Sequence, residues 1–135
     1  MVYLIVFLVA FRKRPVVADS ELVPVSVIVC AHDELENLRE LVPALLSQDY
    51  PEFEVIVVND RSNDGTYDFL LEESQRDPRL RIVNVKETPQ RLNPKKYGIT
   101  LGIKSATNEW ILLTDADCRP SGAQWIRSMS RHFKD

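Results

Sequence analysis

The chain has 135 residues, of which 44% are hydrophobic and 27% are charged. This length and composition are typical of one globular domain with a substantial core, and they exclude a disordered or fibrous protein. The formal net charge of −3 predicts no general attraction to nucleic acid or to an anionic membrane, so phosphate binding would need local groups. The two cysteines, Cys30 and Cys118, lie at or shortly after the ends of apolar runs and are predicted to be buried, reduced thiols.

The first eleven residues are apolar and are followed at once by Arg12, Lys13 and Arg14. A membrane-spanning helix needs about 20 apolar residues, and a signal peptide would carry its positive charges before the apolar run. Residues 1–14 are therefore predicted to be the C-terminal part of an N-terminal membrane helix with its basic flank, which places the following domain on the cytoplasmic side of the membrane. The alternative is a short helix packed on the surface of the domain. Residues 15–23 form a polar linker bounded by prolines.

From residue 24 onward, apolar β-branched runs alternate with amphipathic segments. Strands are predicted over residues 25–30, 53–59, 80–85 and 109–114, and helices over 35–46, 65–76, 95–106 and 121–133. Strands that alternate with helices in this way favour right-handed crossovers within one sheet. The predicted fold class is α/β, with an open, mostly parallel sheet and helices on both faces.

The predicted helix over residues 95–106 has a clear beginning. Asn93 is a typical N-cap, and Pro94 suits the first helical position. Gly98 and Gly102 lie four residues apart on one face of this helix, so we expect the helix to approach the sheet closely.

The other helices carry weaker local signals. Pro43 predicts a bend or a break in the helix over residues 35–46. Ser121 is expected to cap the last helix. In the helix over residues 65–76, the residues expected to face inward are Tyr67, Leu70 and Leu71.

Polar residues follow three of the predicted strands, at residues 32–34, 59–65 and 115–117. Ligands of parallel α/β sheets bind beyond the carboxyl ends of the strands, so these clusters are expected to meet at one rim. Six carboxylates on one rim would repel each other unless a cation or hydrogen-bond donors compensate them. The six are Asp33, Glu34, Asp60, Asp64, Asp115 and Asp117.

Asp115 and Asp117 are the strongest candidates for a metal site. Residues two apart on extended chain point the same way, so two carboxylates lie side by side at the end of an apolar strand. Mg²⁺ and Mn²⁺ prefer carboxylate oxygens and usually complete their coordination with substrate phosphates. The alternative is a simple turn at the end of the strand.

The other polar residues each have a structural alternative. Asp33 and the adjacent Glu34 could cap the following helix, where acids suit the helix dipole. Asp64 is expected to belong mainly to a turn with a helix cap, whereas Asp60 is better placed to accept hydrogen bonds from a base or ribose. His32 could act as a general base, but a lone histidine in a loop is more typical of a surface residue.

The three motifs, in this order, resemble those of the inverting family 2 glycosyltransferases, which include cellulose, chitin and hyaluronan synthases. Members of this family have the GT-A fold, in which one half is a Rossmann-like nucleotide-binding unit. The matching segments are residues 25–34, 57–66 and 112–117. The resemblance extends over residues 24 to about 125. It implies that residues 24–135 form the nucleotide-sugar-binding domain of such an enzyme, ending before the acceptor half.

The resemblance also implies a role for particular residues in binding the nucleotide. Ala31 and Glu34 would border the base, and Asp60 would bind it. The base in this family is usually uracil, so the implied donor is a UDP-sugar. Asp115 would contact the ribose or the metal.

Asp117 would coordinate the Mg²⁺ or Mn²⁺ that bridges the two phosphates. Lys95 matches the lysine that precedes the donor helix of the family, and Lys96 is the alternative register. Two positions depart from the family pattern: Asp33 stands where Asn is usual, and Thr100 stands where the donor helix commonly has Asn.

The acceptor-side residues of the family have no match after Asp117. Inversion requires a base opposite the leaving nucleotide, and this base is expected beyond Asp135. The predicted function is transfer of a sugar from a nucleotide-sugar to a glycan or lipid-linked acceptor, with this chain holding the donor and metal site. The alternative is a non-catalytic nucleotide-sugar-binding module. A sugar nucleotidyltransferase fits less well, because it would have a glycine-rich phosphate loop after the first strand and residues 31–34 contain no glycine. A phospho-acceptor domain also fits less well, because it would have paired acids after the first strand and no membrane segment.

Overall fold

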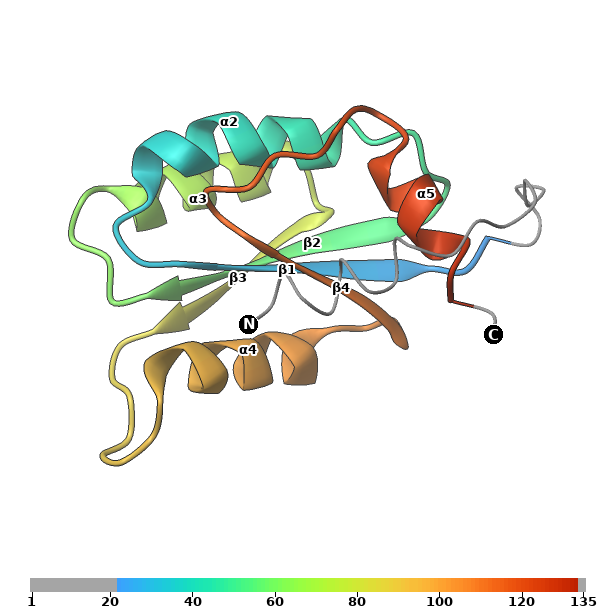
Figure 1. Ribbon diagram of the computed structural model, residues 1–135. Coiled ribbons are helices and arrows are strands. Elements are labelled where there is room, and N and C mark those ends of the chain that lie inside the picture. The colour runs from blue at the N-terminus through green and yellow to red at the C-terminus, as the bar shows by residue number, and fades with distance from the viewer. Residues whose placement is uncertain (1–21, 134–135) are drawn as a thin grey trace.

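The computed structural model describes residues 22–133, which form one sheet with helices packed on it (Figure 1). The strands are β1 (Val25–Ala31), β2 (Phe53–Asp60), β3 (Leu80–Val85) and β4 (Trp110–Asp115). They lie in the order β3-β2-β1-β4, and every neighbouring pair is parallel. The predicted α/β fold with an open parallel sheet is confirmed.

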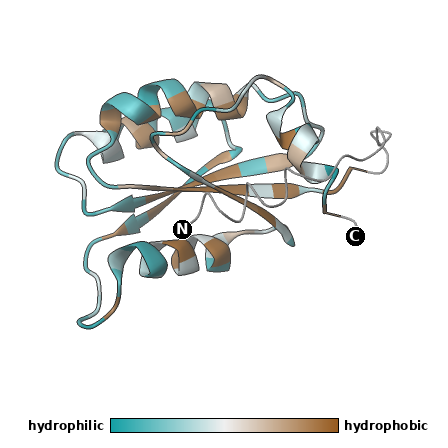
Figure 2. Ribbon diagram, viewed as in Figure 1, coloured by the Kyte–Doolittle hydropathy of each residue, from teal (hydrophilic) through white to brown (hydrophobic). Residues whose placement is uncertain are grey.

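Helices cover both faces of this sheet. They are α2 (Leu35–Leu46), α3 (Thr66–Arg76), α4 (Pro94–Ser105) and α5 (Trp125–Ser130). Helices α2, α3 and α5 lie on one face, and α4 lies on the other (Figure 1). Because both faces are covered, β1 and β2 consist almost entirely of buried residues. Figure 2 shows the strands as mainly hydrophobic, in contrast to the hydrophilic loops at their ends.

Helix α4 begins where the sequence predicts and packs closely on the sheet. The side chain of Asn93 accepts a hydrogen bond from the backbone of Lys96 at 3.1 Å, and Pro94 is the first helical residue. A Cβ atom added to Gly102 would lie 2.7 Å from Cγ2 of Ile28. A contact that short is a steric clash, so the absence of a side chain at Gly102 is what lets this end of α4 approach β1.

The details of two other helices differ from prediction. In α3, Leu70 is fully buried, but Tyr67 and Leu71 are 39% and 41% exposed, because α3 contributes a narrow stripe to the core at the outer side of its layer. Helix α5 begins at Trp125 rather than near Ser121. The preceding segment instead packs against the loop after α2, where the Ala123 carbonyl accepts from the backbone N–H of Asp49 at 2.7 Å.

Helix α2 is not broken at Pro43, since it continues to Leu46. The predicted membrane helix and its basic flank, residues 1–14, lie outside the described residues, as does most of the predicted linker. Within residues 22–133, none of the helices combines the length and apolar character needed to cross a bilayer.

The strand order places a crevice at one end of the sheet. From β1 the chain passes through α2 to β2 on one side, and β4 lies on the other side of β1. The crossover from β1 to β2 runs through α2 on one face of the sheet, whereas the crossover from β3 to β4 runs through α4 on the other face. Crevices of this kind, beyond the carboxyl ends of the strands, are where open α/β sheets bind ligands.

Candidate functional site

A cleft of about 560 Å³ lies at this end of the sheet. It is formed by the ends of β1, β2 and β4 and by the first turn of α4. Its lining includes every residue that the sequence singled out for nucleotide or metal binding: Ala31, Glu34, Asp60, Lys95, Asp115 and Asp117. The convergence of these strand ends on one rim is confirmed.

Asp60 ends β2 and is paired with its neighbour in the chain. The Arg61 Nε donates to Asp60 Oδ1 at 2.8 Å, and a second guanidinium nitrogen lies 3.3 Å from Oδ2. Arg61 adopts a left-handed backbone conformation with φ of 52°, which turns the chain sharply out of the strand. The hydrogen bond to Asp60 raises the pKa of Arg61. The Asp60 side chain is 15% exposed and that of Arg61 43%.

Lys95 and Asp115 form a second ion pair across the cleft. Lys95 Nζ lies 2.9 Å from Asp115 Oδ1, and the Asp115 side chain is 14% exposed. The Asn93 cap fixes the first turn of α4, so Lys95 faces the ends of β1 and β4. Lys95, rather than Lys96, belongs to the cleft lining. The positive charge at this helix start, which opposes the helix dipole, is offset by the carboxylate.

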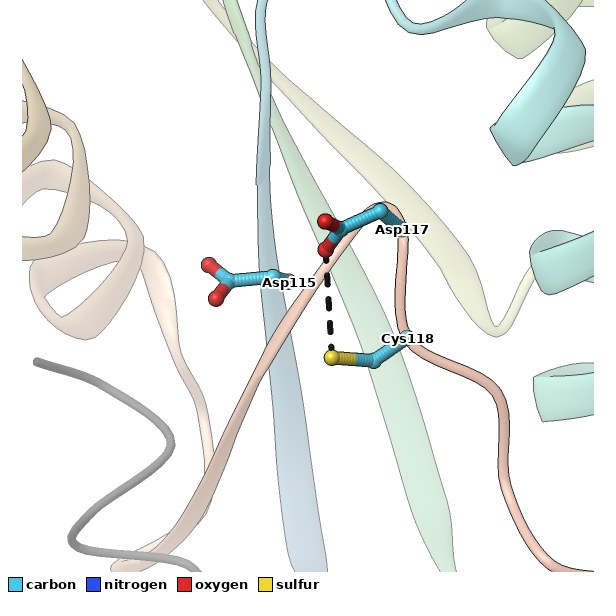
Figure 3. Close-up of side chains that lie close together, drawn as sticks. All are labelled: Asp115, Asp117 and Cys118. Carbon is cyan, nitrogen blue, oxygen red and sulfur yellow. Dashed lines mark hydrogen bonds between the residues drawn. The ribbon is translucent and has the colours of Figure 1, made fainter.

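Asp115, Asp117 and Cys118 each offer one ligand atom, and these three atoms lie within 4.8 Å of one another (Figure 3). A turn closes directly after β4, where the Cys118 backbone N–H donates to the Asp115 carbonyl at 3.1 Å. The Cys118 thiol lies 3.8 Å from Asp117 Oδ1. Two carboxylates so close together suit a hard divalent cation, and the thiol is a softer ligand beside them. The residues present therefore fit a divalent metal.

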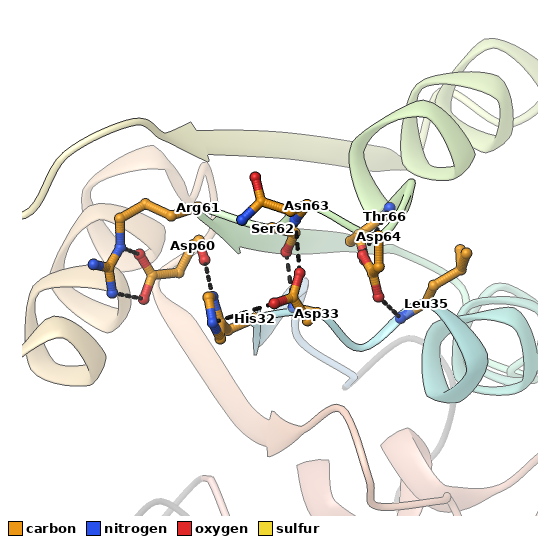
Figure 4. Close-up of polar contacts among 9 residues, drawn as sticks. All are labelled: His32, Asp33, Leu35, Asp60, Arg61, Ser62, Asn63, Asp64 and Thr66. Atoms are coloured by element: carbon orange, nitrogen blue, oxygen red, sulfur yellow. Dashed lines mark hydrogen bonds and ion pairs between the residues drawn. The ribbon is translucent and has the colours of Figure 1, made fainter.

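The loops after β1 and β2 are tied together by polar contacts (Figure 4). The Asp33 carboxylate accepts from the Asn63 N–H at 2.6 Å, and the Asp33 N–H donates to the Ser62 hydroxyl at 3.0 Å. The structural alternative considered for Asp33, a cap of α2, is wrong, because β1 and β2 pair in register and bring their following loops side by side. His32 is exposed, and its Nδ1 lies 2.6 Å from the Asp60 carbonyl. Since a carbonyl can only accept, Nδ1 carries the proton.

Asp64 caps two helices at once. One carboxylate oxygen accepts from the Leu35 N–H at the start of α2, at 3.1 Å, and the other accepts from the Thr66 N–H at the start of α3, also at 3.1 Å. Burial raises the pKa of Asp64, but the hydrogen bonds from Thr66 and Leu35 outweigh it and leave the pKa below its ordinary value. The structural assignment of Asp64 to a turn and helix cap is confirmed. Of the six acids, Asp33 and Asp64 hold the loops, and the other four line the cleft.

Two cleft residues had no sequence signal that marked them as such. Arg61 follows Asp60 directly, but its left-handed backbone could not be foreseen from the residue type. Cys30, on the wall of the cleft, was expected only to be a buried thiol. Burial raises the pKa of Cys30 to about 11, partly offset by the nearby Lys95 ammonium, so the thiol is neutral.

Glu34 lies at the start of α2, on the opposite side of the cleft from α4. Its carboxylate accepts from the Asn37 side-chain amide at 2.7 Å and makes no side-chain cap for the helix. The N–H capping that was considered for Glu34 is supplied by Asp64 instead. The Glu34 carboxylate therefore keeps acceptor capacity on the cleft side.

Comparison with known proteins supports the same family as the motifs. Residues 26–135 match the family described as "Glycosyl transferase family 2". An uncharacterized glycosyltransferase of Haemophilus influenzae is 32% identical over 112 residues, which is 82% of this chain and 32% of that protein. A poly-beta-1,6-N-acetyl-D-glucosamine synthase of Staphylococcus epidermidis is 28% identical over 69% of this chain and 21% of its own length. The chain thus spans between a fifth and a third of these curated relatives.

Two solved structures extend the comparison to the fold. The mannosyltransferase PcManGT from Pyrobaculum calidifontis, in complex with GDP-Man and Mn²⁺, is 26% identical with a TM-score of 0.74, over 98% of this chain and 40% of that one. TarS 1–349 from S. aureus, in complex with UDP-GlcNAc, is 28% identical with a TM-score of 0.63, over 77% and 29%. Together with the cleft and its acidic rim, these matches show that the chain belongs to glycosyl transferase family 2.

Proposed function

We propose that the protein is a glycosyltransferase that transfers a sugar from a nucleotide-sugar, a UDP-sugar, to a glycan or lipid-linked acceptor with inversion, and that this chain holds the donor and metal site. The observation that carries the proposal is the single cleft lined by Asp60, Lys95, Asp115 and Asp117 at the topological switch of the sheet. Such a cleft combines acceptors for a base and ribose with a cation and a metal site for a diphosphate.

The base binds at the side of the cleft formed by β1, β2 and the start of α2. Ala31 is 3% exposed and provides an apolar floor, while Glu34 and Asp60 supply acceptors at its edges. A uracil ring offers one N–H donor and an apolar face, which this combination can satisfy. The TarS complex with UDP-GlcNAc supports the choice of uridine.

The diphosphate binds at the side formed by β4 and α4. Asp117 and Asp115 would hold a Mg²⁺ or Mn²⁺, and Lys95, which lines the same cleft, would meet a phosphate oxygen. When bound, the cation supplies positive charge that stabilises the departing nucleoside diphosphate. The PcManGT complex with Mn²⁺ supports a divalent cation in this family.

Donor binding exchanges the ion partners inside the cleft. Asp60 is paired with Arg61 and Asp115 with Lys95, so each of these two carboxylates has a cationic partner within the cleft. A base that binds Asp60 displaces the Arg61 guanidinium, which is 43% exposed and can turn to solvent. Lys95 would be available to the diphosphate when Asp115 serves as a metal ligand. Asp60 and Asp115 would therefore remain compensated before and after binding.

The attachment of the protein to a membrane is part of the same proposal. Residues 1–11 are apolar and Arg12, Lys13 and Arg14 follow them. An apolar segment followed by basic residues supports a membrane-associated protein with the sugar-transferring domain on the cytoplasmic side. Lipid-linked or growing glycan acceptors would be accessible there.

Calorimetric titration of the chain with UDP, with and without Mn²⁺, tests the donor site. We expect Mn²⁺ to raise the affinity for UDP at least tenfold, and Asp117→Ala to abolish this gain. Glu36→Ala is the matched control, because Glu36 is an acid on α2 whose side chain is 85% exposed and pairs with Arg39. Equal affinity for UDP with and without Mn²⁺ would contradict the proposed site.

Turnover separates a transferase from a module that only binds nucleotide-sugars. Transfer or hydrolysis of a UDP-sugar is measured for this chain and for a form that includes any sequence encoded after Asp135. We expect negligible transfer by the chain itself and clear transfer by the longer form. Binding without turnover in both would favour the binding module.

A further inference from the structure

Arg119 is a loop residue that makes an unusual number of directed contacts for its position. It follows the turn after β4, and one of its guanidinium nitrogens donates to the carbonyls of Ala116 and Cys118 at 2.9 and 2.8 Å. The rest of the guanidinium reaches α2, where Nε donates to the Glu40 carboxylate at 3.2 Å. The Arg119 side chain therefore binds both the turn after β4 and the outer surface of α2.

A second contact on α2 extends this link to the other side of the cleft. Arg119 Nη2 donates to the side-chain carbonyl of Asn37 at 3.1 Å. The amide nitrogen of the same Asn37 donates to Glu34 Oε2 at 2.7 Å. Asn37 thus uses both ends of its amide, and a continuous chain of hydrogen bonds joins Glu34, on the base side of the cleft, to the turn that carries Asp117.

The turn needs such support because it lies outside the sheet. The last pair of β1 and β4 is Cys30 with Asp115, so the backbone after Asp115 has no strand partner in that ladder. Asp117 is exposed, and its carboxylate lies 3.8 Å from the neighbouring thiol. The direction of the Asp117 carboxylate is therefore set mainly by the backbone of the turn, which Arg119 holds by two of its carbonyls.

We propose that Arg119 is a positioning residue that holds the metal-binding turn against α2 and, through Asn37, couples the occupancy of the metal site to that of the base site. This inference rests on the proposed function of the cleft. It goes beyond it because neither Arg119 nor Asn37 lines the cleft. A nucleotide that engages Glu34 orders the chain of hydrogen bonds, and an ordered turn presents Asp117 to the metal with less loss of conformational freedom.

Arg119 is suited to test by substitution because it adds little to global stability. The Arg119 and Glu40 side chains are 33% and 74% exposed, and an ion pair so open to solvent is weak. Arg119→Gln should therefore fold. Arg39→Gln is the matched control, since Arg39 also pairs with an acid of α2, Glu36, on an exposed surface away from the cleft.

The readout is the gain in UDP affinity that Mn²⁺ provides, measured by calorimetry on the whole chain. We expect Arg119→Gln to reduce this gain about tenfold while UDP affinity without metal stays within twofold of the unsubstituted chain. Arg119→Lys should restore part of the gain, because one ammonium can meet the turn carbonyls but cannot reach Glu40 and Asn37 together. A merely structural role would lower both affinities together and would not show this partial rescue.

A double-mutant cycle tests the link through α2. Asn37→Leu alone should lower the Mn²⁺-dependent gain, and combining it with Arg119→Gln should add little, because both act through one chain of contacts. Additive losses, or an unchanged gain in Arg119→Gln, would overturn the proposal. Absence of UDP binding by the unsubstituted chain would instead refute the proposed function. If Arg119→Gln does not fold, Glu40→Gln combined with Asn37→Leu frees Arg119 from α2 and gives the same test.

Discussion

Strand β2 carries an acid at each end on the face that α4 covers, and the two acids have very different surroundings. Glu54, near the start of the strand, is 8% exposed. Its Oε1 accepts from the Ser26 hydroxyl and the Thr107 N–H, both at 2.7 Å, and its Oε2 accepts from Arg81 at 3.0 Å. Asp60, at the other end, lines the cleft and is paired with the adjacent Arg61.

The difference separates an acid that holds the fold from one that is available to a ligand. The partners of Glu54 come from β1, β3 and the segment between α4 and β4, so its carboxylate joins four parts of the chain. The partner of Asp60 is a half-exposed neighbour in sequence that can leave without disturbing the core. Both residues are acids at an end of the same strand. The number of fixed hydrogen-bond donors around each carboxylate decides whether it holds the fold or remains available to a ligand.

The largest expected effect is on stability at the Glu54 end. Glu54→Gln removes the negative charge opposite Arg81. It also places an amide NH₂ group, a hydrogen-bond donor, against neighbours that are donors themselves. Replacing one member of a buried, hydrogen-bonded ion pair should lower the free energy of unfolding by about 3 kcal/mol. Urea denaturation followed by circular dichroism measures this. In the folded variant, affinity for UDP with Mn²⁺ should stay within twofold; a loss of binding without loss of stability would overturn the structural role of Glu54.

The reverse pattern is expected at Asp60. Asp60→Asn should keep the free energy of unfolding within about 1 kcal/mol of that of the unsubstituted chain, since the partner Arg61 is 43% exposed and such pairs contribute little. Affinity for UDP in the presence of Mn²⁺ should fall about tenfold, as expected when a hydrogen bond to a charged acceptor is weakened. Calorimetry on the variant, with Glu54→Gln as its matched partner, measures both quantities. If Asp60→Asn is destabilised but binds UDP with unchanged affinity, the proposed difference between a structural Glu54 and a ligand-binding Asp60 is wrong.

The smallest expected effect is on stability in acid. Burial raises the pKa of Glu54, but hydrogen bonds from Ser26, Thr107 and Arg81 outweigh it and bring the pKa below the ordinary value of 4.5. The unfolded chain therefore takes up this proton at a higher pH than the folded chain. The contribution of Glu54 is fully present above about pH 4.5. It is lost as the pH falls through the folded pKa, by at most about 1.4 kcal/mol per pH unit.

Urea denaturation at a series of pH values below 5 should show this loss as a falling free energy of unfolding. Glu54→Gln should fall less steeply over the same range, because the titrating group is gone. Asp60→Asn should follow the unsubstituted chain more closely. Identical slopes for all three proteins would show that Glu54 does not contribute to acid unfolding.

Much of the fold could be predicted from the sequence because its signals are local. The β-branched runs become β1 and β2, and the shorter run over residues 80–85 becomes β3 with the predicted bounds. Asn93 and Pro94 begin α4 because a cap needs residues within one helical turn only. The small residues Gly98 and Gly102 predicted a close approach of α4 to the sheet, and that approach is observed.

The same locality explains why the candidate site could be placed. Parallel strands put their carboxyl ends at one edge whatever their order, so the acids that follow the strands had to gather there. This reasoning brought Asp60, Asp115 and Asp117 to one rim without knowledge of which strand neighbours which. Where it failed, as for the inward faces of Tyr67 and Leu71, the helix lies at the margin of its layer and buries fewer residues than its pattern allows.

The sequence by itself determined the alternation of strands and helices, the parallel sheet and the rim on which the acids gather, because periodicity and caps act over a few residues. The tertiary structure decided which donor each acid meets: Asp64 rather than Asp33 caps α2, Arg61 pairs with Asp60, and Arg119 reaches α2. These partners are separated in sequence or depend on loop backbone, so strand pairing and register had to bring them together first. The contacts of a loop side chain are therefore decided only when the strands that hold the loop have paired.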